Sequence, residues 1–235
     1  MNTDRVVGPN RVPWSWKPIT AVLVLTFFIV TPVIEIGLFH YLRNLTKNDL
    51  YAGTGTGAVM AVVFTLAVYV LCIRPYGLSW KAVGFRRFHR SVWKWIFLGS
   101  IFLVAVAALI MTAVEVLGFS YDNARADSIQ NNRSIIGIFV ALISAAVISP
   151  LYEEIVYRGV FYAFFRTRFG ILMGLSINAA IFSLAHIPLY HLLPLTFIGG
   201  VVFGWLYERS GSIVPPMLAH GLSNLIFVVL SALPR

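Results

Sequence analysis

The sequence has little charge for its length. Only 11% of its 235 residues are Asp, Glu, Lys or Arg, whereas soluble domains carry about 25%. Nine residues are acidic and 18 are Lys or Arg, which gives a formal net charge of +9. Hydrophobic residues make up 59% of the chain. This composition excludes an ordinary soluble domain and predicts a protein that lies largely within a membrane.

Cysteine is almost absent as well. The single cysteine, Cys72, lies within an apolar run, so an intramolecular disulfide and a cysteine-based zinc site are both excluded. The sequence also lacks the HExxH motif of helix-borne zinc proteases and the nucleophile elbow of soluble serine hydrolases. It has no rhomboid-type serine motif and no presenilin-type aspartate motif.

The excess of positive charge does not indicate nucleic-acid binding. Basic residues concentrate in the cytoplasmic loops of membrane proteins, and no basic, aromatic surface domain accompanies the charge here. We therefore expect the lipid bilayer, and no nucleic acid, as a partner.

Long uncharged apolar runs are abundant, and a helix that crosses a bilayer needs about 20 such residues. We predict an all-α fold, a polytopic transmembrane helical bundle of about seven to eight spans. One span is expected to be broken at Pro150, where Ser149 would cap a new helix. The spans are predicted at residues 19–42, 54–73, 93–117, 134–166, 171–187, 192–208 and 214–232.

The positions of Lys and Arg predict the orientation of these spans. With the N-terminus inside, the inner segments hold 12 of these residues and the outer segments hold five. We therefore expect a cytoplasmic N-terminus. The compact length, without a large soluble insertion, is typical of a prokaryotic protein, so we expect an integral protein of a prokaryotic inner membrane. The basic segment 74–91 is expected to lie on the anionic cytoplasmic leaflet.

Two adjacent glutamates and an arginine interrupt the apolar sequence. Ionisable groups inside a membrane are costly, so each is a functional candidate. Glu154 and Arg158 are four residues apart and share a helix face. Glu153 has only Tyr157 at that offset, so it lacks a local cation and is available as a general base. The alternative is a structural ion cluster of all three charged groups.

His186 lies near the end of the following span. The turn between the two spans is expected near residues 167–170, about 15 residues after Glu153 and about 17 before His186. Antiparallel packing would then bring Glu153 and His186 to nearly the same depth. A carboxylate beside an imidazole can activate water or form half of a metal site. Alone, His186 would be interpreted as an interfacial residue at a helix end.

His220 and Asn224 are four residues apart and share one face of an apolar helix. They could form a hydrogen bond between helices, donate to a developing oxyanion, or bind a metal. Glu35 follows Pro32 in the first span and is expected either to line a cavity or to have a structural role.

The expected depths of these residues conflict. Glu153 and His186 would lie about 25 Å from the inner turn, whereas His220 follows the start of its span by only a few residues. Either the segment 210–214 enters the membrane, or the orientation predicted for this half of the chain is wrong.

Most of these residues lie in three short motifs. The sequence contains EEIVYR at 153–158, FSLAH at 182–186 and HGLSN at 220–224. They match EExxxR, FxxxH and HxxxN, in the same order, and so the segment 134–229 resembles the CAAX prenyl protease and bacteriocin-processing family, also called the Abi family. The resemblance implies an intramembrane endopeptidase that acts on a peptide or on the C-terminus of a lipidated protein.

The resemblance also implies a role for each motif residue. Glu153 and His186 would activate water, and His220 and Asn224 would stabilise the tetrahedral oxyanion. Glu154 and Arg158 would hold the first motif helix in place. The candidate catalytic residues are Glu153, Glu154, His186, His220 and Asn224.

Members of this family have been described both as metalloproteases and as metal-free glutamate proteases. We assign no cofactor, although zinc, if present, would be bound by Glu153, His186 and His220. The chain is divided into 1–133, with N-terminal transmembrane helices and a basic loop, and 134–232, a catalytic helical core. A membrane scaffold or a bacteriocin self-immunity protein is the alternative function. A proton-coupled transporter is a third, but no inverted repeat supports it.

Overall fold

The computed structural model describes residues 12–118, 124–187 and 189–233. Every regular element within these ranges is helical, which confirms the all-α prediction. The elements are α1 (Trp16–Val24), η1 (Leu25–Leu38), α2 (Phe39–Thr46), α3 (Asp49–Val68), η2 (Tyr69–Ile73), η3 (Arg74–Tyr76), η4 (Trp80–Val83), η5 (Arg90–Val92), α4 (Trp93–Val116), α5 (Ala124–Gln130), α6 (Ile135–Ile143), η6 (Ser144–Ile148), α7 (Ser149–Glu154), η7 (Ile155–Tyr162), α8 (Ala163–Leu184), η8 (Tyr190–Leu192), α9 (Leu193–Ser210) and α10 (Val214–Ala232).

The described residues form a polytopic transmembrane bundle. Six helical stretches are long and apolar enough to cross a membrane. Large apolar side chains cover the outside of the bundle; Phe28, Leu109 and Leu172 are 74%, 70% and 80% exposed. Apolar surface on this scale indicates contact with lipid hydrocarbon rather than with water.

The longest of these stretches, Ile135–Leu184, is a hairpin of two antiparallel segments. Gly170 has φ 80° and ψ 178°, which interrupts the helix. The rings of Tyr157 and Phe182 lie 4.9 Å apart, although a straight helix would separate these residues by about 37 Å. The stretch that is divided at Gly170 therefore crosses twice, so the six stretches of the described residues make seven passes. This number agrees with the predicted spans.

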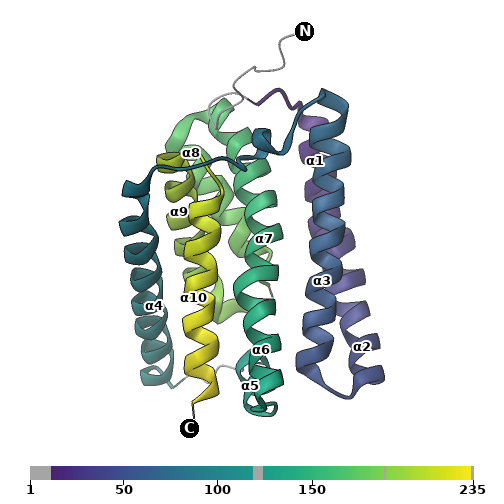
Figure 1. Cartoon of the computed structure of the whole chain (residues 1–235), viewed down its shortest axis with the longest axis vertical. Helices are drawn as coiled ribbons and strands as arrows, with labels where there is room; N and C mark the ends of the chain where they lie inside the picture. Colours follow the sequence, from purple (N-terminus) through teal and green to yellow (C-terminus); the bar gives the residue numbers. More distant parts are fainter. Residues whose placement is uncertain (1–11, 119–123, 188, 234–235) are drawn as a thin grey trace.

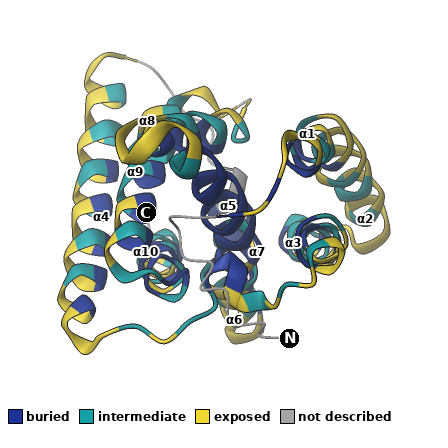
Figure 2. Ribbon diagram, turned by 90° about the horizontal axis from the view of Figure 1, so that it is seen from above, coloured by how far each residue is buried: buried dark blue, intermediate teal, exposed yellow. Residues whose placement is uncertain are grey.

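The helix that carries the first motif lies at the centre of the bundle. Figure 2 shows α7 between one group formed by α1, α2 and α3 and another formed by α4, α8, α9 and α10. Figure 1 shows α3 and α4 on opposite sides of this central helix. All residues of η7, which continues α7, are buried. The motif residues are therefore shielded from lipid by helices on both sides.

The predicted break at Pro150 is wrong. Ser149 has helical φ and ψ of −60° and −52° and the helix continues through it, after the π-helical segment η6. Proline has no N–H to donate, so a carbonyl four or five residues earlier loses its partner. The side chain of Asn224 donates to the carbonyl oxygen of Ala145 at 2.8 Å. The wider helical turn and this donor from α10 let the helix continue without a break.

The basic segment 74–91 is expected from its sequence to lie on the membrane surface, but part of it is buried in the bundle. Val83 is completely buried, and its carbonyl oxygen would lie 2.7 Å from a Cβ atom built on Gly159 of the central helix. The N–H of Ile213 donates to the carbonyl oxygen of Gly84 at 2.9 Å. Part of this segment therefore inserts between the central helix and the start of α10.

This insertion resolves the conflict in depth. Ile213 is completely buried. It is bonded to Gly84, and the preceding residue, Val83, packs against Gly159. From these positions the helices advance about 10 Å to His220 and about 8 Å to Glu154, so these two residues meet. The segment 210–214 thus packs into the bundle beside the central helix.

Candidate functional site

Glu154 is the centre of a buried polar cluster. Its Oε1 atom accepts a hydrogen bond from Nη1 of Arg158 at 3.0 Å, and both side chains are completely buried. The same oxygen lies 3.0 Å from Nδ1 of His220. The guanidinium group of Arg158 also lies over the rings of Phe182 and Phe203, at 4.6 and 5.1 Å. The pair predicted between Glu154 and Arg158 is present, and it fixes the central helix against α8, α9 and α10.

Glu153 lies on a different face of the helix and lines a cavity of about 120 Å³. Its side chain is 13% exposed, and its Oε2 atom lies 3.9 Å from Nε2 of His220. That oxygen has no hydrogen-bond partner among the described residues. A buried carboxylate oxygen without a donor is costly, so this arrangement indicates a group that is kept for a ligand or for water.

His186 lines the same cavity from the turn that follows α8, which confirms that the hairpin brings it to the depth of Glu153. Its Nδ1 atom lies 2.8 Å from the carbonyl oxygen of Phe182. A carbonyl can only accept a hydrogen bond, so Nδ1 carries a proton, and Nε2 is an acceptor when the ring is neutral. A carboxylate and an imidazole acceptor at one cavity can together orient a water molecule and take its proton.

The opposite wall of the cavity comes from the first two spans, which carry none of the three motifs. Glu35 is part of this wall. Two roles were expected for it, and the structure shows the one in which it lines a cavity. Its carboxylate interacts with the side chain of Thr31. The cavity is thus formed by both predicted segments, 1–133 and 134–232. The lining residues from the first two spans are Thr26, Val30, Thr31, Glu35, Met60 and Phe64.

His220 and Asn224 share a helix face, as predicted, but they contact different groups. His220 lies against Glu154, and Asn224 donates to Ala145. The second contact is the hydrogen bond between helices that was one of the expected alternatives. The structure describes both residues, and neither side chain lines the cavity.

The residues do not fit a three-ligand metal site. Within residues 12–118, 124–187 and 189–233, no group of three or more His, Cys, Asp or Glu side chains is arranged to hold a metal ion. A catalytic zinc site needs three protein ligands that converge on one point.

Tyr157 is a cavity residue that the sequence did not single out. From the sequence, Tyr157 was considered only as the uncharged residue four positions after Glu153. The structure places both side chains on the cavity wall, and the offset of four was the signal that could have identified it.

Comparison with known proteins agrees with this geometry. Residues 135–226 match the family described as type II CAAX prenyl endopeptidase Rce1-like. This segment, under half of the chain, is similar to the Rce1-like family. All six motif residues considered above lie within it, whereas the opposite wall of the cavity lies outside it.

Two curated bacterial proteins are similar over most of their length. The chain is 23% identical over 225 residues to the "Putative membrane peptidase YdiL" of Bacillus subtilis (strain 168), which covers 93% of this chain and 89% of that protein. It is 26% identical over 182 residues to an "Uncharacterized 24.3 kDa protein" of Escherichia coli, which covers 73% and 80%. No solved structure matches the chain.

Proposed function

We propose that the protein is an intramembrane endopeptidase that hydrolyses a peptide bond in a membrane-associated or lipidated peptide. The observation that carries this proposal is the presence of Glu153 and His186 at one cavity, on opposite arms of a hairpin within the Rce1-like segment. A relative named as a membrane peptidase supports the same class of reaction.

In this proposal Glu153 takes a proton from a water molecule that Nε2 of His186 helps to orient. The water oxygen attacks the carbonyl carbon of the substrate, and the carbonyl oxygen becomes an oxyanion. The proton then moves to the leaving nitrogen and the C–N bond breaks. The products are a carboxylic acid and an amine, so no redox partner is required.

Glu154, Arg158 and His220 act as positioning residues. Arg158 and His220 both contact Oε1 of Glu154, and His220 also lies near Glu153. His220 therefore connects the buried ion pair to the carboxylate that faces the cavity. This contact supports a role in which His220 sets the position and charge environment of Glu153.

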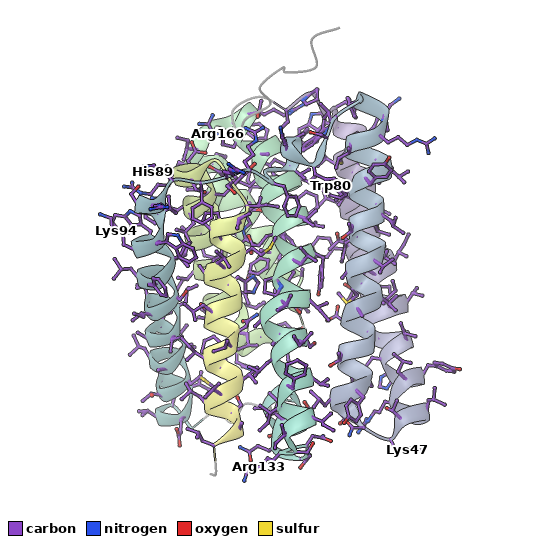
Figure 3. The ribbon with its side chains drawn as sticks, in the orientation of Figure 1. Lys47, Trp80, His89, Lys94, Arg133 and Arg166 are labelled. Carbon is purple, nitrogen blue, oxygen red and sulfur yellow. The ribbon has the colours of Figure 1, made fainter. Side chains whose placement is uncertain are left out.

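We further propose that the protein lies in the inner membrane of a prokaryotic cell with its N-terminus in the cytoplasm. Figure 3 shows His89, Lys94 and Arg166 near one end of the bundle and Lys47 and Arg133 near the other. The first end holds most of the basic residues, which is typical of the cytoplasmic side.

The function can be tested with purified protein in liposomes and a set of membrane-associated peptides, both unmodified and prenylated. Cleavage is followed by mass spectrometry for the wild type, Glu153→Gln and His186→Gln, with Glu115→Gln as the control, since Glu115 is exposed on α4. We expect cleavage by the wild type and the control, and losses of at least about 100-fold in the other two.

The same assay distinguishes the alternatives. Cleavage that a strong chelator leaves unchanged supports the metal-free mechanism, and loss that zinc reverses contradicts it. A folded wild type that cleaves none of the peptides would favour a scaffold or immunity function, in which the buried cluster around Glu154 is only structural.

A further inference from the structure

The cavity needs a hydrogen-bond donor for the oxyanion, and most of its polar groups cannot supply one. The hydroxyl of Thr26 donates to the carbonyl of Val22 at 2.8 Å, and that of Thr31 donates to the carbonyl of Thr26 at 3.0 Å. His186 donates through Nδ1 to the carbonyl of Phe182. These protons are committed to protein acceptors.

The donors that the family resemblance implies lie outside the lining of the cavity. Asn224 donates to Ala145, and His220 lies between Glu154 and Glu153. A donor on the cavity wall would act beside them on the oxyanion of a substrate bound at Glu153.

Tyr157 differs from all of these groups. Its ring is 5% exposed and it lines the cavity, and its hydroxyl makes no hydrogen bond with any residue that the structure describes. It follows Glu153 by four residues, so the two side chains share one face of the central helix. Tyr152 also lines the cavity, but it precedes Glu153 by one position, and its ring is stacked on Phe64 at 5.6 Å.

The Tyr157 ring is held in place from two sides. Its edge contacts are with Phe161, at a centroid distance of 5.8 Å, and with Phe182, at 4.9 Å. Phe182 lies one helical turn before His186, and its carbonyl binds the His186 ring. The Tyr157 ring is therefore held by Phe161 and Phe182 at the cavity that Glu153 and His186 also line, so its position is set before a substrate binds.

We propose that Tyr157 is a further catalytic residue, whose hydroxyl donates a hydrogen bond to the oxyanion of the tetrahedral intermediate. This inference rests on the proposed endopeptidase function. As water adds to the carbonyl carbon, the C=O double bond becomes a single bond and its oxygen gains negative charge. The Tyr157 O–H stabilises that charge without giving up its proton, and the hydrogen bond weakens again when the C–N bond breaks.

The test is Tyr157→Phe, which removes the hydroxyl and keeps the ring that packs on Phe182. A donor that acts on the oxyanion stabilises the transition state more than the bound substrate. We therefore expect kcat to fall on the order of 100-fold, with KM and the unfolding temperature close to those of the wild type. Tyr69→Phe is the control, because Tyr69 is half-exposed and stacks on Trp80 outside the cavity.

The outcomes separate this inference from the function on which it rests. A wild-type kcat for Tyr157→Phe, while Glu153→Gln is inactive, overturns the assignment of Tyr157 alone. A rise in KM with unchanged kcat also overturns it, because the hydroxyl would then bind substrate only. A loss of kcat in Tyr152→Phe instead assigns the donor to Tyr152. Wild-type cleavage by Glu153→Gln contradicts both proposals.

Discussion

Glu154 and Arg158 form a salt bridge of 3.0 Å in which both side chains are completely buried. The pair lies in the middle of the central helix, where neither charge can reach water. Its attraction is opposed by the loss of hydration of both groups, so its net contribution to stability can be small. Removal of one partner, in contrast, leaves a buried charge without compensation.

We therefore expect Arg158→Met to lower the free energy of unfolding by about 3–5 kcal/mol. The double variant Glu154→Leu/Arg158→Leu should be more stable than the single Arg158→Met variant. Arg87→Met is the control, because Arg87 is exposed, and its effect should stay within about 0.5 kcal/mol. Thermal unfolding in detergent measures all three, and a single variant as stable as the control would contradict this account of the pair.

Gly221 allows close contact between α10 and the central helix. A methyl group at this position would overlap the carbonyl oxygen of Ala146, one turn before Pro150. We expect Gly221→Ala to destabilise the protein by about 1–3 kcal/mol and to reduce cleavage, because the neighbouring His220 would move away from Glu154.

The matched control for this substitution is Gly57→Ala in α3. A Cβ atom at Gly57 would have Ser144 Oγ, at 4.0 Å, as its nearest neighbour, so the added methyl group fits. This variant should be as stable as the wild type or slightly more stable. Equal losses in both variants would mean that α10 is not packed on the helix as described.

Asn224 distinguishes a structural from a catalytic role for the third motif. Because its side chain donates to the carbonyl of Ala145, Asn224→Ala should lower stability by about 1 kcal/mol. It should change kcat by less than about 10-fold when assayed well below its unfolding temperature. Unchanged stability with a loss of about 100-fold in kcat would instead support the oxyanion role that the family resemblance implies.

The orientation can be tested through cysteine accessibility. The native Cys72 is buried and should not react in the folded protein, so each added cysteine reports alone. A membrane-impermeant maleimide should label Lys47→Cys and Arg133→Cys in cells with an intact inner membrane. It should label His89→Cys and Lys94→Cys only after that membrane is permeabilised. The reverse pattern would place the N-terminus outside.

The sequence predicted the contacts that depend on helix spacing. The pair between Glu154 and Arg158 follows from an offset of four residues, and the common depth of Glu153 and His186 follows from equal arm lengths around the turn at Gly170. Both predictions use only the regular geometry of one hairpin, which the apolar runs already delimit.

The remaining features depend on how distant segments pack. The partner of Asn224 was not predictable, because the carbonyl of Ala145 needs a donor only when the helix widens before Pro150 instead of breaking there. The position of Val83 against Gly159 requires a loop to enter the bundle, and its basic composition indicated a surface location. The cavity wall at Glu35 comes from a span that has no motif.

The central claim is that Glu153 and His186 act together on one water molecule. The most direct measurement is kcat/KM for Glu153→Gln, His186→Gln and the double variant on one cleaved peptide. Groups that act as a unit give non-additive losses. The account predicts that the double variant is within about threefold of the less active single variant. Losses that multiply in the double variant would show independent roles and would contradict the proposed site.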